Sequence, residues 1–196
     1  MALISPLSSS EQPMAIATIV AAFAADPVER WLWPEADAYE AGFPDFVTAF
    51  GGEAFEQGTA WRVEGESVAA LWLAPGIEPA EEPIVDALTR TVATEKHDDL
   101  FSTLEQMADI HPSFPHWYLP WLAVAPALQG RGYGGQLLEH GLRTVDAAGL
   151  PAFLETPNPR TVGLYERHGF EVIGTAQAGN CPPITSMLRE AASWVR

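Results

Sequence analysis

The stretch that most constrains this chain is a glycine-rich segment that follows a predicted strand. The strand spans Trp117–Val124, where aromatic and branched residues dominate. Residues 129–135 then read Gln-Gly-Arg-Gly-Tyr-Gly-Gly, and we expect a helix over Tyr133–Ala148. Glycine lets the main chain approach a bulky anion, and the free N–H groups at a helix start favour negative charge. The pattern predicts a cradle for a phosphate or pyrophosphate group.

Two other nucleotide-binding patterns fit this segment less well. Gly130, Gly132 and Gly135 formally spell the dinucleotide fingerprint G-x-G-x-x-G, and Glu155 follows about 20 residues later. That fingerprint places its first glycine directly after the strand, whereas residues 126–129 intervene here, and too little chain follows for a second half of a doubly wound sheet. A P-loop is excluded because no Gly-Lys-Ser/Thr follows.

Composition narrows the class of protein. The chain has 196 residues, of which 47% are hydrophobic, enough for one domain with a core. We find neither an apolar run that could span a membrane nor a signal peptide, and the single cysteine, Cys181, fits a reducing compartment, so we expect a cytoplasmic protein. A net charge of −16 argues against a nucleic-acid partner and favours cationic partners.

Alternating strand and helix patterns predict an α/β (α+β) fold with a mixed central sheet of about six to seven strands flanked by helices. Besides Trp117–Val124, we expect strands at residues 3–7, 59–63, 67–74, 151–156, 170–175 and 184–189. Helical patterns cover residues 11–25, 36–57 with a kink or break near Gly42–Pro44, 82–97, 98–109 and 159–168. We expect residues 31–34, Trp-Leu-Trp-Pro, to form an aromatic loop.

Two motifs together resemble the GNAT N-acetyltransferase superfamily. The first is Leu-Ala-Val-Ala-Pro at residues 122–126 followed by Gln-Gly-Arg-Gly-Tyr-Gly at 129–134, which is similar to the family's acetyl-CoA signature Gln/Arg-x-x-Gly-x-Gly/Ala. The second is Leu-Glu-Thr at 154–156, then Asn158, then Leu-Tyr-Glu-Arg-His-Gly-Phe at 164–170. The layout of the front half and the Pro-Ala-Phe-Leu-Glu-Thr segment look like the puromycin N-acetyltransferase branch.

The resemblance implies direct transfer of an acetyl group from acetyl-CoA to the primary amine of a small, cationic molecule. It divides a single domain, residues 1–196, into an acceptor-side half at 1–76, a helical insertion at 77–115 before the central strand, and an acetyl-CoA-binding half at 116–196. A protein or peptide N-acetyltransferase and a non-catalytic acyl-CoA sensor remain alternatives. We expect no metal, no nucleic acid and no membrane partner, and a homodimer is left open.

The resemblance also indicates which residues hold acetyl-CoA. The main chain of two strand residues would face the coenzyme, the glycine loop would donate N–H groups, and Arg131 would add charge. Pro120 is a poor residue for a central strand and fits a bulge or a splay there. The set expected is Leu122, Val124, Gln129, Gly130, Arg131, Gly132, Tyr133, Gly134, Gly135 and Asn158.

Tyr165 matches the family's general acid, because a tyrosine can protonate a thiolate of similar pKa. The general base stays open between Glu155, our first candidate, and His116, our second. Two-residue periodicity would place His116, Tyr118 and Pro120 on one strand face with Leu122.

The acceptor pocket is expected between the aromatic loop and the strand that precedes the glycine segment. Trp31, Trp33 and Tyr118 are the predicted acceptor-binding residues. The alternative for the tryptophans is that they fill the core beneath the loop, since buried aromatic residues dominate cores.

Overall fold

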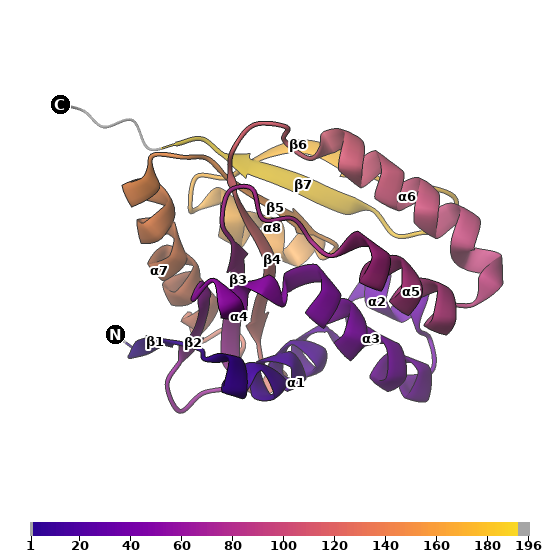
Figure 1. Cartoon of the computed structure of the whole chain (residues 1–196), viewed down its shortest axis with the longest axis horizontal. Coiled ribbons are helices and arrows are strands. Elements are labelled where there is room, and N and C mark those ends of the chain that lie inside the picture. Colours follow the sequence, from indigo (N-terminus) through magenta and orange to yellow (C-terminus); the bar gives the residue numbers. More distant parts are fainter. Residues whose placement is uncertain (1, 192–196) are drawn as a thin grey trace.

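The computed structural model describes residues 2–191, which form one seven-stranded sheet with helices on both faces (Figure 1). The strand order is β1-β2-β3-β4-β5-β7-β6; only β4 and β5 are parallel, and the other neighbouring strands are antiparallel. The strands are β1 Ile4–Pro6, β2 Ala60–Val63, β3 Val68–Leu73, β4 Trp117–Val124, β5 Ala152–Thr156, β6 Glu171–Ala176 and β7 Ile184–Arg189. The predicted mixed sheet is confirmed.

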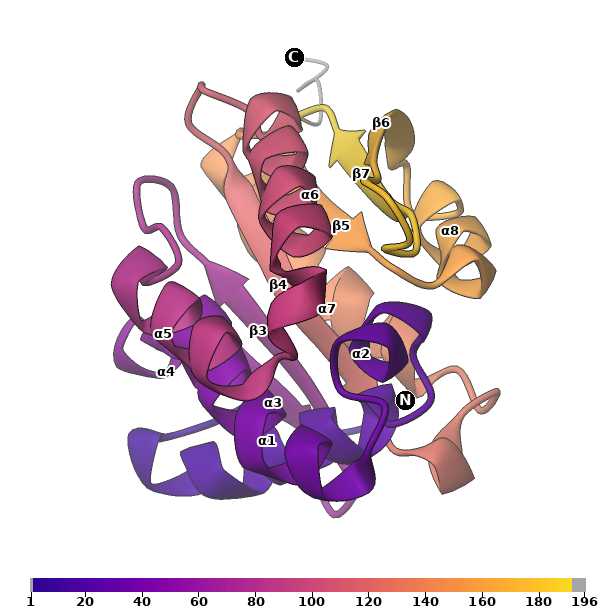
Figure 2. The ribbon, with the colours of Figure 1, turned by 90° about the vertical axis from the view of Figure 1, so that its right-hand side faces the viewer.

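The helices divide between the two faces of the sheet (Figures 1 and 2). One face, called the acceptor face below, carries α1 Gln12–Phe23, α2 Pro27–Leu32, α3 Ala36–Gly51, α4 Glu53–Glu56, α5 Glu81–Thr91 and α6 His97–Ile110. The opposite face, called the loop face, carries α7 Tyr133–Ala148 and α8 Pro159–Glu166. Within residues 2–191, no helix is both long and apolar enough to cross a membrane.

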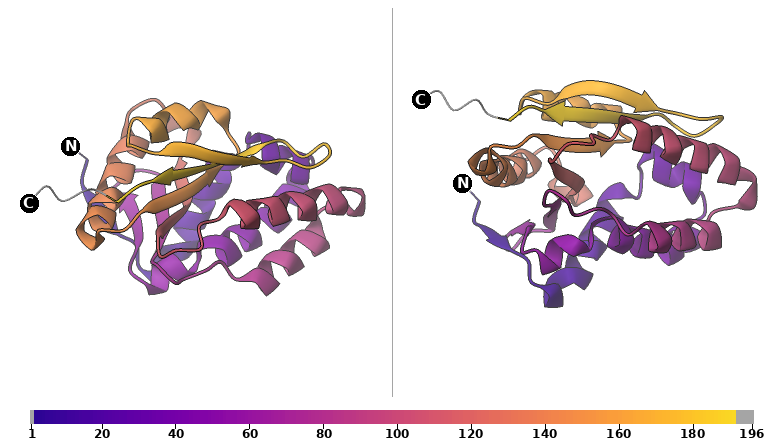
Figure 3. Two further views of the ribbon diagram at one scale, coloured as in Figure 1. Left: turned by 90° about the horizontal axis from the view of Figure 1, so that it is seen from above. Right: turned by 45° about the horizontal axis from the view of Figure 1, so that its top comes forward.

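The segment between β3 and β4 is helical, as its sequence pattern predicted. It forms α5, a short 3-10 turn at Thr94–Lys96, and α6, while two further 3-10 turns lie at Ser9–Glu11 and Pro126–Leu128. Helix α6 packs beside the β6–β7 hairpin, which is yellow in Figure 3. This packing joins the segment to strands that lie far along the chain.

Two local predictions were wrong. Residues 31 and 32 belong to helix α2 rather than to a loop, because Asp26 caps that helix by accepting the Val28 N–H at 3.0 Å. Helix α3 continues through Pro44 and ends at Gly51. Its buried face, with Phe43 and its neighbours, offsets the hydrogen bond that proline cannot make.

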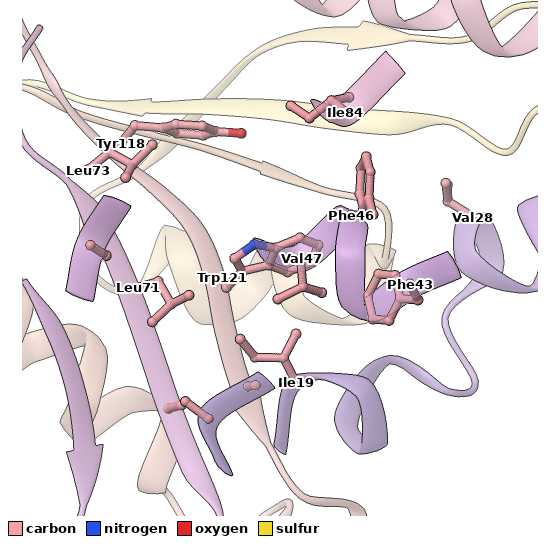
Figure 4. Close-up of a cluster of buried hydrophobic side chains, with 14 of the residues drawn as sticks. Ile19, Val28, Phe43, Phe46, Val47, Leu71, Leu73, Ile84, Tyr118 and Trp121 are labelled. Carbon is pink, nitrogen blue, oxygen red and sulfur yellow. The ribbon is translucent and has the colours of Figure 1, made fainter. Parts of the chain in front are cut away.

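Strand β3 forms the centre of both cores, since all six of its residues are buried. Alternate residues point to opposite faces. Leu71 and Leu73 pack with the acceptor-face cluster, and Figure 4 shows Leu73 beside Tyr118 of β4. Val68 and Trp72 pack on the loop face beneath α7.

Strand β4 is irregular at Pro120. Trp121 pairs with Leu71 and Tyr118 pairs with Leu73, so β4 has one more residue than β3 across this step. Pairing with β5 ends at Leu119, which confirms the predicted bulge and splay.

The extra residue also shifts the alternation of side chains along β4. Tyr118 and Trp121 both lie in the acceptor-face core, whereas Leu122 packs on the loop face. The prediction that Tyr118 and Leu122 share a face was therefore wrong, because simple two-residue periodicity does not hold across a bulge.

Gly141 lies where α7 crosses β3. A Cβ at this position would stand 2.6 Å from Cε2 of Trp72, whose side chain is 1% exposed. We expect Gly141→Ala to lower the free energy of unfolding by about 1–3 kcal/mol, because the enclosed indole cannot move away. Urea unfolding measures this change.

Gly163→Ala in α8 is the matched control. Its Cβ would meet only the side chain of Arg167, at 3.6 Å. We expect this variant to gain up to about 1 kcal/mol, because alanine favours helix more than glycine does. Wild-type stability of Gly141→Ala would contradict the packing described for α7.

Candidate active site

A cavity of about 790 Å³ is lined from both faces of the sheet. Residues of the glycine loop and α8 line it on the loop face, and residues of α1, α2, α3 and α6 line it on the acceptor face. It reaches both faces because β4 and β5 separate after Leu119. The volume lies within the range of small-molecule sites.

The glycine loop forms a concave entry to α7. Gly130 and Gly132 have φ angles of 76° and 83°, which residues other than glycine rarely adopt. Gly132 is the N-cap of α7. A Cβ at Gly130 would meet no heavy atom within 4 Å, and one at Gly132 only Gln136 Nε2 at 3.9 Å. Open space in front of the first N–H groups of a long helix suits an anion such as a diphosphate.

Main-chain groups at the end of β4 face the gap between β4 and β5. The Ala125 N–H donates to Ser67 O at 3.0 Å, so that residue faces β3. Because hydrogen-bonding direction alternates along a strand, Leu122 and Val124 face the opposite edge, where β5 no longer pairs. Gln129 Nε2 donates to Val124 O at 3.1 Å, which ties the loop to the strand.

Most of the predicted coenzyme-binding residues line this cavity. They are Leu122, Val124, Gln129, Gly130, Gly132, Tyr133, Gly134, Gly135 and Asn158. Arg131 is exposed and is not among the lining residues. The Tyr133 hydroxyl donates to Glu66 Oε1 at 3.0 Å, and Asn158 Oδ1 accepts the Arg160 N–H at 3.1 Å as the cap of α8.

Glu155 and Tyr118 form a buried pair in the cavity wall. The Tyr118 hydroxyl donates to Glu155 Oε2 at 2.8 Å, while Glu155 Oε1 is buried and lacks a partner among residues 2–191. Burial raises the pKa of Glu155 to about 7, although the bond from Tyr118 opposes the shift. A carboxyl group with this pKa can exchange a proton near neutral pH.

Tyr165 lines the cavity from the loop face. Its ring packs edge-on against Phe170, with centroids 5.9 Å apart, and its side chain is 7% exposed. Burial raises the pKa of Tyr165 above its ordinary value, so the hydroxyl stays protonated at neutral pH. Tyr165 thus lies in the cavity wall as a protonated side chain, and its part in proton transfer stays a prediction.

His116 lies outside the cavity lining. Its Nδ1 is 2.8 Å from Phe114 O, and its Nε2 is 3.1 Å from Nε2 of His111. The imidazole is buried between a loop carbonyl and a second histidine. The structure therefore brings Glu155, Tyr118 and Tyr165 to one cavity and leaves His116 out.

The two tryptophans predicted for the acceptor pocket also lie elsewhere. Trp33 is fully buried among Tyr39, Phe43 and Phe46, and its Nε1 donates to a threonine hydroxyl of α5. Trp31 is half-buried, and neither residue lines the cavity. The prediction was wrong because α2 forms here and directs Trp33 into the core.

Two acidic residues in the cavity wall escaped the sequence analysis. Asp26 and Glu29, at the start of α2, are buried and line the acceptor-face part of the cavity. The Asp-Pro pair signals a helix start, but it does not show that the acids face inward. Their burial depends on how α2 packs against other helices.

Comparisons with known proteins identify a family. The profile of the Acetyltransferase (GNAT) family matches residues 25–170. An uncharacterized N-acetyltransferase of Schizosaccharomyces pombe is 32% identical over 77 residues, which cover 38% of this chain and 31% of that protein. The match thus spans about a third of the curated relative.

Solved structures share the fold. A Corynebacterium glutamicum protein described as a histone acetyltransferase and related acetyltransferase has a TM-score of 0.69 at 24% identity, with 100% of both chains covered. The Drosophila melanogaster polyamine N-acetyltransferase, which forms N-acetylagmatine, has a TM-score of 0.65 at 16% identity, covering 97% of this chain and 100% of that one. An agmatine N-acetyltransferase mutant has a TM-score of 0.62 at 19% identity, covering 95% and 97%.

Proposed function

Because the chain belongs to the acetyltransferase (GNAT) family, we propose that it transfers an acetyl group directly from acetyl-CoA to the primary amine of a small, cationic molecule. The observation that carries the proposal is the single cavity that joins the glycine loop on one face of the sheet to Glu155 on the other. A donor bound along the loop and an acceptor bound near Glu155 would meet in the gap between β4 and β5.

The residues of the loop face fit acetyl-CoA, which when bound supplies an acetyl group on a thioester. The N–H groups at the start of α7, behind Gly130 and Gly132, would hold the diphosphate. The main chain of Leu122 and Val124 would hold the adjoining arm of the coenzyme, because these groups face the gap.

Two side chains carry the proton transfers in this proposal. Glu155, with its pKa near 7, accepts the proton that the attacking amine loses. Tyr165 donates a proton to the departing sulfur, and Tyr118 orients Glu155 through its hydrogen bond to Oε2. The proton gained by Glu155 and the proton given by Tyr165 balance the exchange.

The size of the cavity supports a small acceptor, because about 790 Å³ is typical of small-molecule sites. Side chains of α2, α3 and α6 line its acceptor-face part. The polyamine and agmatine enzymes among the structural neighbours act on small amines, which supports the same class here. The likeness to the puromycin N-acetyltransferase branch, the division of the domain, the lack of a metal, the cytoplasmic location and a homodimer stay predictions.

Two measurements test the proposed function. Acetyl-CoA is expected to raise the melting temperature of the protein, because a ligand of the folded state stabilises it by mass action. Coenzyme A should then be released from acetyl-CoA in the presence of small primary amines and not of peptides. A protein that acetyl-CoA stabilises but that releases no coenzyme A with any amine would be a sensor.

The assignment of Glu155 as base predicts a pH-dependent rate. In the wild type, kcat/KM should rise as pH increases through about 7, because the carboxylate must be ionised to accept a proton. Glu155→Gln should lose this rise together with most of the activity. His116→Ala is the matched control, and loss of the rise in that variant alone would assign the base to His116 instead.

The assignment of Tyr165 as acid predicts a selective loss of turnover. We expect Tyr165→Phe to lower kcat by about tenfold or more while leaving the affinity for acetyl-CoA intact, because the ring still packs but no proton is available. Steady-state kinetics and a calorimetric titration with acetyl-CoA measure the two quantities. Unchanged turnover would remove Tyr165 from the mechanism.

A further inference from the structure

Two carboxyl groups in the cavity wall have no part in the proton transfers. Asp26 and Glu29 are 6% and 4% exposed, and both line the cavity. Asp26 uses Oδ1 to cap α2, but Glu29 Oε2 is enclosed and has no hydrogen-bond partner among residues 2–191. Enclosing a carboxylate without a partner is destabilising, and a cation bound beside it would offset that cost.

No cation of the described chain compensates these two acids. The ion pairs found in residues 2–191 involve neither Asp26 nor Glu29. Two cations that bond to α2 or the residues just after it are engaged with main-chain carbonyls: the Arg30 guanidinium donates to Pro34 O, and the Lys96 ammonium donates to Trp31 O.

The pKa values of Asp26 and Glu29 reflect the lack of a compensating cation. Burial raises the pKa of Asp26 to about 6, against the hydrogen bonds of its helix cap. Burial also raises the pKa of Glu29 well above its ordinary value, and the charge of Asp26 adds to the shift. A positive charge placed beside the two groups would favour their ionised forms.

The rest of the acceptor-face wall suits an aliphatic chain. Glu155 lines the same cavity as Asp26 and Glu29. Apart from these acids, the wall there is largely apolar and includes Phe46, Phe50, Leu88, Leu100, Leu104 and Met107. An apolar wall with acids at two positions matches a molecule with a cationic group at each end of an apolar chain.

We propose that Asp26 and Glu29 bind a second cationic group of the acceptor, which makes the preferred acceptor a diamine or an amino-guanidine rather than a monoamine. The inference rests on the proposed function, in which the reacting amine binds near Glu155. The second cation stays charged and forms charge-assisted hydrogen bonds with Glu29. An acceptor that lacks the second cation leaves the Glu29 carboxylate without a partner, and this difference is the reason that a diamine is preferred to a monoamine.

Diaminobutane and butylamine test the proposal, since they differ only in the second amino group. We expect the wild type to prefer diaminobutane by about tenfold or more in kcat/KM. Glu29→Gln should bring the ratio of kcat/KM for diaminobutane to kcat/KM for butylamine toward one. The change should come mainly from a higher KM for diaminobutane, while kcat changes little. A fall in kcat for both amines would show instead that Glu29 acts in the chemical step and would overturn the proposal.

Two further variants make the comparison specific. Glu40→Gln removes the same charge from an exposed position on α3 outside the cavity, and it should keep the wild-type ratio. Asp26→Asn keeps a side chain that can cap α2 and should also lower the ratio. Asp26→Asn therefore serves as the test if Glu29→Gln does not fold.

Calorimetric titration of each amine into the protein with coenzyme A separates this proposal from the proposed function. Tighter binding of diaminobutane than of butylamine that is lost in Glu29→Gln supports the cation site, even if neither amine is acetylated. Turnover of both amines with equal kcat/KM and equal affinity would overturn the cation site and leave the acetyltransferase activity standing.

Discussion

The structure depends on one extra residue in strand β4. The bulge at Pro120 ends the pairing of β4 with β5 at Leu119, so the only parallel pair in the sheet is held together along part of its length. Beyond that point the two strands diverge, and the cavity extends across the sheet. The same bulge sends Tyr118, which hydrogen-bonds to Glu155, to the acceptor face, and it sends Leu122 to the loop face, where Tyr165 also lies.

A bulge persists only where the surrounding residues pack against it, and here Trp121 makes the main packing contacts. Its ring meets Phe23 edge-on at 5.2 Å and Phe43 at 5.6 Å, and it lies against α3 in Figure 4. Gly51 allows the approach, since a Cβ there would stand 2.6 Å from Cδ1 of the indole. The aromatic side chains in and before α3 therefore hold the strand, and two of them, Phe46 and Phe50, also line the cavity.

Local signals in the sequence were enough for most of the elements and for the glycine-rich entry to α7, while the binding of an anion there stays a prediction. The helix predicted over Tyr133–Ala148 has the observed bounds, and Asn158 caps α8 as its position before proline predicted. The two-residue alternation of the sequence could not show which way side chains point beyond Pro120. The bulge depends on the pairing register between β4 and β3, which the sequence of β4 alone does not give. Nor could it show that Asp26 and Glu29 are enclosed, since that follows from contacts between segments far apart in the chain.

The enclosed carboxyl groups couple folding to the uptake of protons. Burial raises the pKa of Asp26 to about 6 and that of Glu155 to about 7, and it also raises the pKa of Glu29, so at these groups the folded protein binds more protons than the unfolded one over a range that begins near pH 4. Their contribution to the free energy of unfolding is complete below that range and is lost as pH rises through it. These three groups therefore make the folded state less stable as the pH rises toward neutrality.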